Sequence, residues 1–149
     1  MDSEAAAYSE RFLAFLAREA VEWRATATPD SEAAGAYQIE VESPNENASA
    51  PLWISTADEE ITVGFDAYHS HFETWHFESE DMAFREALAL ARDIVAEKLL
   101  VASWWNGEKW SGSQLIELGD EVKRSDRTPA DACLRIRSWT GKYDREEKG

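Results

Sequence analysis

Three histidines and an aspartate in the middle of the chain are the residues whose types and spacing come closest to a chemical site. Asp66, His69, His71 and His76 follow one another closely. In an extended strand alternate side chains share a face, so the His-x-His pair places both imidazoles on one side. Two such imidazoles can bind zinc, or one can transfer a proton while Asp66 or Glu73 orients its ring.

Several interpretations of this cluster stay open. A zinc site would need a further ligand from a distant carboxylate, because the chain has a single cysteine, Cys133. Acid-base catalysis by His69 or His71 is a second interpretation, and contact with a partner is a third. We favour a structural or hydrogen-bonding role. We therefore predict no catalytic residue, no cofactor and no metal, with His69 and His71 as the only candidate ligands.

The spacing of glycine and serine argues against common nucleotide-binding and hydrolase sites. Gly107, Gly112 and Gly119 fit neither the dinucleotide-binding nor the phosphate-binding pattern, and no serine stands in a G-x-S-x-G sequence. Direct binding of nucleic acid is disfavoured as well, because it requires clustered cations. Arg135 and Arg137 are the main exception, and we expect them to pair with acidic residues on a neighbouring strand.

Charge is the most informative property of the chain. Its 149 residues include thirty acids and fifteen Lys and Arg, a formal net charge of −15. Residues 1–81 hold eighteen acids and three bases, whereas residues 82–149 hold twelve of each. No Lys or Arg stands between Arg24 and Arg85, a stretch with thirteen acids. Such a block either steers a basic partner or only keeps the protein soluble.

Seven tryptophans supply large apolar side chains. We expect Trp23, Trp53 and Trp75 in the core. Three other tryptophans lie on either side of a predicted loop tip, and for them too we favour packing in the core. Any of these that are exposed beside charged residues would have the composition of an interface hot spot. The three that bracket the tip are Trp104, Trp105 and Trp110.

Two amphipathic helices must position these residues. Residues 3–24 carry apolar side chains at close to the helical period. A second helix begins with Ser79, Glu80 and Asp81, whose side chains suit a helix N-terminus, and should end near Lys98.

Alternating polar and apolar residues predict strands at 37–42, 52–56, 61–65 and 134–139, and the third strand continues or folds back through 68–77. The run 99–102 is apolar on both faces and belongs in the centre of a sheet. Asn106-Gly107 predicts a type I′ hairpin in which Trp105 faces Glu108 and Trp104 faces Lys109. The fold class is therefore α+β, with an antiparallel sheet of about five to seven strands packed against two main helices.

The chain length is that of one domain, so we expect residues 1–149 to form a single acidic domain with frayed ends at 1–2 and 142–149. The sequence has neither a secretory signal nor eighteen consecutive apolar residues. A lone cysteine fits a reducing compartment. We expect a cytoplasmic protein of unknown oligomeric state.

Two segments separated by a predicted helix carry a resemblance to a known family. They read EITVGFDAYHSHFETW and EKLLVASWWNGEKWSGSQLI. Over residues 60–116 this pattern of strand, helix and aromatic hairpin resembles small bacterial immunity proteins of polymorphic toxin systems. The resemblance implies a cytoplasmic antidote that occludes the active site of a toxin.

Charge and resemblance lead to the same expectation. The protein is an acidic protein-binding module without enzymatic activity, an immunity protein that neutralises a basic, nuclease-like toxin domain. Its partner is a basic protein, with no direct contact to nucleic acid or membrane. The alternatives are a small metal-dependent or histidine-based enzyme and a DNA-mimic inhibitor. The residues expected to contact the partner are Glu40, Glu42, Asp58, Glu59, Glu60, Asp66, Glu73, Trp104 and Trp105.

Overall fold

A computed structural model describes residues 3–120, 122 and 132–148. Helices and antiparallel strands in this part confirm the α+β class, although the strands form two sheets, of five and four strands, where we expected one. The chain divides into two compact units. Unit 1 comprises Met1–Glu42, Pro51–Gly64 and His69–Ala91, and unit 2 comprises Ser43–Ala50, Phe65–Tyr68 and Arg92–Gly149.

The two predicted helices are present, and the first is shorter than predicted. Helix α1 (Ser3–Glu19) stops at Ala20, whose φ of −152° and ψ of 65° are not helical, and a single further turn, α2 (Val21–Arg24), follows. Helix α3 (Glu80–Val95) begins with Glu80 as predicted, and the Ser79 Oγ accepts a hydrogen bond from the Met82 N–H at 3.1 Å. This bond satisfies one of the amide groups left free at a helix N-terminus.

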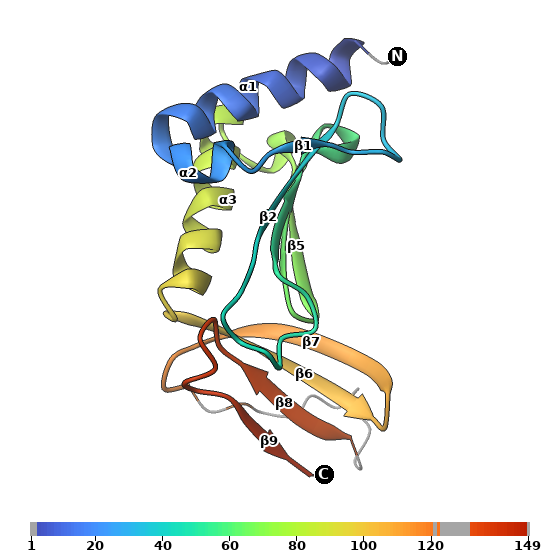
Figure 1. The fold of residues 1–149 in the computed structure, drawn as a ribbon, viewed down its shortest axis with the longest axis vertical. Helices are drawn as coiled ribbons and strands as arrows, with labels where there is room; N and C mark the ends of the chain where they lie inside the picture. Colours follow the sequence, from blue (N-terminus) through green and yellow to red (C-terminus); the bar gives the residue numbers. More distant parts are fainter. Residues whose placement is uncertain (1–2, 121, 123–131, 149) are drawn as a thin grey trace. The chain divides into compact units, whose positions relative to one another are not determined.

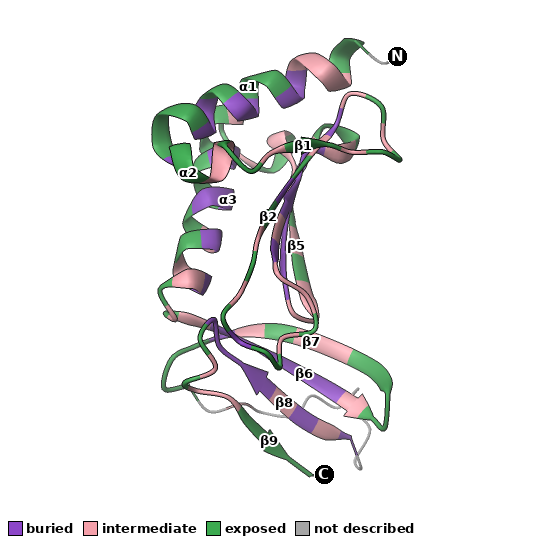
Figure 2. Ribbon diagram, in the orientation of Figure 1, coloured by how far each residue is buried: buried purple, intermediate pink, exposed green. Residues whose placement is uncertain are grey.

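The first sheet runs in the order β1-β2-β3-β4-β5 (Figure 1). Ile39, Ile54 and Val63 align across three of its strands and are almost fully buried. These three residues belong to the core of unit 1, where Phe12 of α1 contacts Phe84 of α3 at 5.1 Å between ring centroids. Figure 2 shows buried residues in purple on α1, on α3 and on the strands of this sheet. Burial alternates along β2 and β5, whereas all five residues of β4 are buried and both residues of β1 are exposed. The five strands are Thr28–Pro29, Tyr37–Val41, Leu52–Ser55, Ile61–Phe65 and Tyr68–Phe72.

Short helical turns adjoin strands of this sheet. The turn η1 (Ala57–Glu59) separates β3 from β4, and η2 (Thr74–His76) separates β5 from α3. The chain folds back between β4 and β5 at Asp66, whose φ is 53°. The folded-back alternative for residues 68–77 is therefore correct.

The second sheet has the order β7-β6-β8-β9 and belongs to unit 2. The apolar run 99–102 lies within β6, which has neighbours on both sides as predicted (Figure 1). Fraying after Gly141 was a wrong prediction for residues 145–147, because they pair with β8 as an edge strand. The strands are β6 (Leu99–Asn106), β7 (Lys109–Glu117), β8 (Cys133–Arg137) and β9 (Arg145–Glu147).

The β6–β7 hairpin forms, but its register differs from the prediction. Asn106 pairs with Lys109 and Trp105 pairs with Trp110, so the two central turn residues are Gly107 and Glu108. Gly107 has φ of 62°, whereas Glu108 does not have a positive φ. Positive φ at the first central residue alone is the signature of a type II′ turn, which needs glycine at that place. The predicted type I′ turn is therefore wrong.

Candidate functional site

The solvent-facing side of the five-stranded sheet brings together most of the chemically capable side chains of unit 1. Register pairs Glu40 with Trp53 and Trp53 with Gly64, which places these three on one face. Thr62 lies on the same face two residues before Gly64. His69 and His71 of β5 join them, because His69 contacts Trp53 and His71 contacts Thr62. We call this surface the open face.

His71 is held by two neighbours on the open face. Its Nδ1 lies 2.8 Å from Glu60 Oε1 and 3.0 Å from Thr62 Oγ1. The Glu60 side chain is only 19% exposed, whereas that of His71 is 47% exposed. A carboxylate at Nδ1 fixes the ring and leaves Nε2 for other contacts. We expected Asp66 or Glu73 to orient a histidine here, and the structure places Glu60 in that role.

His69 lies between His71 and Trp53. Its ring centroid is 5.1 Å from that of His71, edge to face, and 6.2 Å from that of Trp53. The Trp53 indole in turn lies directly over Gly64, where a Cβ atom would overlap it. Trp53 is thus only partly buried and forms part of a surface row of rings, instead of the core residue that we predicted.

The other members of the histidine cluster lie elsewhere. The Asp66 carboxylate belongs to unit 2, where Oδ1 accepts hydrogen bonds from the Ser49 N–H at 2.8 Å and hydroxyl at 3.1 Å. His76 pairs with Glu73 at 3.0 Å and stacks on Trp75. Within the described ranges, no three His, Cys, Asp or Glu residues are arranged to hold a metal ion. The pair formed by Glu60 and His71 is capable of accepting a proton at Nε2.

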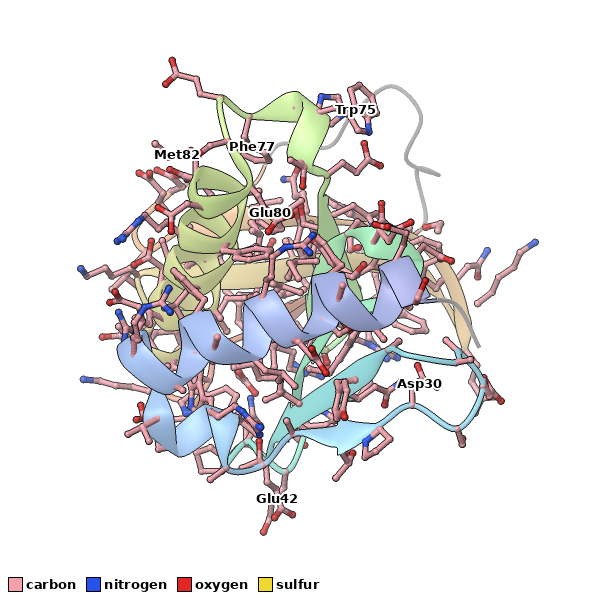
Figure 3. All side chains as sticks on the ribbon, turned by 90° about the horizontal axis from the view of Figure 1, so that it is seen from above. Asp30, Glu42, Trp75, Phe77, Glu80 and Met82 are labelled. Atoms are coloured by element: carbon pink, nitrogen blue, oxygen red, sulfur yellow. The ribbon has the colours of Figure 1, made fainter. Side chains whose placement is uncertain are left out.

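The carboxylates expected to face a partner differ in their surroundings. Glu40, Glu42, Asp58 and Glu59 are exposed, and none of them pairs with a cation among the residues that the structure describes. The acids of unit 1 do not all gather in one place, because Figure 3 shows Glu42 at the lower edge of the view, well apart from Glu80.

Charge nevertheless separates sharply between the two units. Unit 1 contains seventeen acids and four arginines, a formal net charge of −13, whereas unit 2 contains thirteen acids and eleven bases, a net charge of −2. Two of the four arginines are paired inside unit 1, Arg11 with Glu80 at 2.7 Å and Arg85 with Asp81 at 2.6 Å. Thirteen of the fifteen excess negative charges of the sequence therefore belong to one structural unit.

Arg135 and Arg137 are paired as predicted. Glu146 of β9 lies 2.7 Å from Arg137 Nη2 and 3.8 Å from Arg135 Nε. The Arg135 guanidinium also lies 4.6 Å from the ring centroid of Trp105. The hydrogen bond from Arg137 holds the pKa of Glu146 below its usual value. These contacts use the cations within unit 2, so they do not form a free basic patch.

Tryptophan exposure is the property that the sequence predicted least well. Trp104, a predicted anchor, is 6% exposed and belongs to the core of unit 2, so a docking partner does not reach it. Trp105 is partly buried, and its indole N–H donates to Ser103 Oγ at 2.8 Å. Trp75, predicted as a core residue, is 76% exposed, and Trp110 is 51% exposed.

A cavity of about 230 Å³ lies in unit 2 between Leu100, Ile116, Ile136 and Tyr143. This volume is below the usual range for a ligand pocket, roughly 300–1,000 Å³. Neither His69 nor His71 lines it.

Within the described part of the chain, no helix is long and apolar enough to cross a bilayer.

Comparison of the chain with protein-family models, with curated proteins and with solved structures finds no match. The family suggested by residues 60–116 therefore stays a prediction.

Proposed function

We propose that the protein is a cytoplasmic binding module that captures a basic protein partner through unit 1, and that this partner is a nuclease-like toxin whose active site it occludes. The single observation that supports this proposal is the segregation of charge, with a net of −13 on unit 1 and −2 on unit 2. A nuclease cleft must be positive to bind phosphates, so it is complementary to a unit of this charge.

The field of unit 1 acts at long range and does not require one flat acidic face. Over a Debye length of about 8 Å in physiological salt, carboxylates on several edges add to one attractive potential for an approaching cation-rich surface. Glu40, Glu42, Asp58 and Glu59 contribute fully, because no described cation neutralises them. The proposed role of these residues is therefore to accelerate association, while a smaller contact area determines the lifetime of the complex.

The open face offers a less supported enzymatic role. Glu60 and His71 are close enough for acid-base chemistry, but neither of them lines the cavity of unit 2. We therefore base the proposal on binding.

The proposal expects the gene beside this one to encode a nuclease-like toxin, and the test is direct binding of this chain to that toxin domain. The full chain and the purified toxin domain are mixed in a calorimeter, and the nuclease activity of the toxin is measured with and without the chain. We expect a one-to-one complex, loss of nuclease activity, and survival of cells that express both proteins. No heat of binding, or a complex in which the nuclease stays fully active, contradicts the proposal.

A further inference from the structure

Trp75 is the most exposed of the large apolar side chains in the described structure, at 76%. Exposing an indole to water is unfavourable, since the ring can bury a large apolar area in a contact. Tryptophan is also among the residues that most often dominate binding energy at protein interfaces. The residue therefore needs an explanation beyond chance exposure of an apolar atom.

The indole of Trp75 is held in place and does not lie on a free loop. It belongs to η2, where the His76 N–H donates to the Glu73 carbonyl at 3.0 Å and the Phe77 N–H donates to the Thr74 carbonyl at 3.1 Å. The His76 ring stacks on it at 3.7 Å between centroids, and Glu73 in turn holds His76 at 3.0 Å. A side chain fixed in this way loses little conformational entropy when it binds.

Two further apolar side chains follow Trp75 closely in the sequence. Phe77 is partly buried and stacks on Phe72 at 6.1 Å, and Met82 in the first turn of α3 is 38% exposed. Figure 3 shows Trp75, Phe77 and Met82 along the same edge of the view. We call these three residues the Trp75 patch.

Acids are frequent in the segment that carries the Trp75 patch. Residues 73–82 contain four acids and no Lys or Arg. Arg11 and Arg85 neutralise two of the four, and His76 contacts a third. Glu78 has no partner among the residues described. An apolar centre on a unit with a net charge of −13 fits a partner surface with an apolar pocket and a rim of lysines or arginines.

We infer that the Trp75 patch is the anchor by which unit 1 holds its basic partner, with the indole inserted into an apolar pocket that cations surround. This inference rests on the proposed function and adds the contact that determines how long the complex lives. The field of unit 1 attracts the partner, and the patch supplies the apolar burial that electrostatic attraction alone lacks.

Two synthetic peptides test the inference without prior identification of the partner. Both carry the same number of lysines, and one of them also carries leucines at helical spacing. Their dissociation constants are measured by fluorescence anisotropy for the full chain, for Trp75→Ala and for Trp110→Ala. Trp110 is the matched control, because it is also an exposed tryptophan but lies in the nearly neutral unit. Circular dichroism checks that each variant is folded.

We expect the leucine-containing peptide to bind more tightly than the lysine peptide, and Trp75→Ala to weaken it by about tenfold while Trp110→Ala leaves it unchanged. Binding of both peptides with equal affinity, unaffected by Trp75→Ala, overturns the anchor and leaves the proposed function standing. Failure of both peptides to bind overturns the anchor, whereas the proposed function is overturned separately, by the absence of binding to the toxin domain. Light scattering tests whether a second copy of the chain binds at the patch instead. A dimer that Trp75→Ala converts to a monomer would assign the patch to self-association and overturn the inference.

Discussion

Gly64 is needed because of a close approach and not because of its backbone angles. The indole of Trp53 occupies the space that a side chain at Gly64 would fill, and the ring also contacts His69. We expect Gly64→Ala to lower the free energy of unfolding by about 1–3 kcal/mol, because the methyl group must displace a large ring on the open face. Urea denaturation measures this change. An unaltered midpoint would show that Trp53 does not rest on Gly64.

Tyr8 carries a buried hydroxyl, with the residue 2% exposed; the Thr74 side chain lies near the oxygen, but no hydrogen bond of good geometry forms in the described structure. Removing an unsatisfied buried hydroxyl removes its desolvation cost. We therefore expect Tyr8→Phe to leave the free energy of unfolding at pH 7 unchanged, or to raise it by up to about 1 kcal/mol. A loss of about 1 kcal/mol instead would mean that the hydroxyl makes a hydrogen bond.

The same residue predicts a pH dependence. Burial first, then the charges of Glu80 and Glu60, raise the pKa of Tyr8 above its usual value. In the unfolded chain tyrosine loses its proton near pH 10, while the folded state still holds it. Stability should therefore fall as the pH rises above about 10, and Tyr8→Phe should reduce this fall. Thermal unfolding across that range measures both slopes.

At the residue scale, the sequence predicted correctly those contacts that depend on alternation within a single strand. Alternation placed His69 and His71 on one face, and their rings lie 5.1 Å apart. It did not identify Glu60 as the partner of His71, because that contact depends on how β4 and β5 pair. Exposure of Trp75 was missed for a similar reason, since composition favours burial of an aromatic ring and only the turn η2 directs it outward.

Among the elements, η1 is a strained connection. Asp58 and Glu59 both have positive φ, at 63° and 54°. Aspartate tolerates this conformation better than glutamate, because its short side chain bonds to nearby backbone. We expect Glu59→Gly to raise the free energy of unfolding by about 0.5–1 kcal/mol, the relief of strain less the added freedom of the unfolded chain.

Glu78→Gly is the control for η1. Glu78 is also exposed but does not have a positive φ, so glycine there relieves no strain and should leave stability unchanged or lower it. Calorimetric melting of the two variants compares them. Equal effects at both positions would rule out strain in η1.

The edge strand β9 depends on Arg137, which is 9% exposed and donates to Glu146 Oε1 at 2.7 Å and to the Asn47 carbonyl at 3.3 Å. We expect Glu146→Gln to cost about 1 kcal/mol. The cost is small for a buried arginine because Glu146 is 55% exposed and Asp144 remains 4.0 Å away. Glu147→Gln, which affects only an exposed pair with Arg145, is the control.

Because the pKa of Glu146 is lowered, the stabilising contribution of its contact with Arg137 depends on pH. Its contribution is present above the pKa of an unfolded glutamate, about 4.3, and is lost as the pH falls through the lower folded value. The wild type and Glu146→Gln should therefore converge in stability in acid. A difference that persists at about pH 2 would contradict the ion pair as its source.

Periodic elements were predicted well, and the remaining differences have physical causes. Helix α3 and the central strand β6 follow from apolar spacing. The first helix stops at Ala20 although the apolar pattern continues through Trp23. The β9 sequence Arg145–Glu147 shows no apolar alternation, because its pairing relies on charged neighbours in β8. The hairpin register depended on which residue pair occupies the turn, which a two-residue motif leaves undetermined.

At the scale of the whole molecule, the decisive property is the distribution of charge. Its uneven distribution along the sequence becomes an uneven distribution between the two units. The chain crosses between the units several times, so this outcome did not follow from the sequence order alone. Glu46 and Asp66, from the acidic stretch, belong to unit 2, whereas Arg85 belongs to unit 1. The net charges nevertheless stay far apart, at −13 and −2.

The most direct test of the account is the association rate constant with the proposed toxin partner, measured by stopped flow at low and high salt. The double variant Glu40→Lys, Glu42→Lys replaces two negative side chains of unit 1 by positive ones. The double variant Glu108→Lys, Glu117→Lys makes the same change at exposed sites of unit 2. We predict that the unit 1 variant associates about tenfold more slowly at low salt, that the unit 2 variant changes much less, and that high salt removes the difference. Equal slowing by both variants, or rates that do not depend on salt, would contradict the claim that unit 1 attracts the partner.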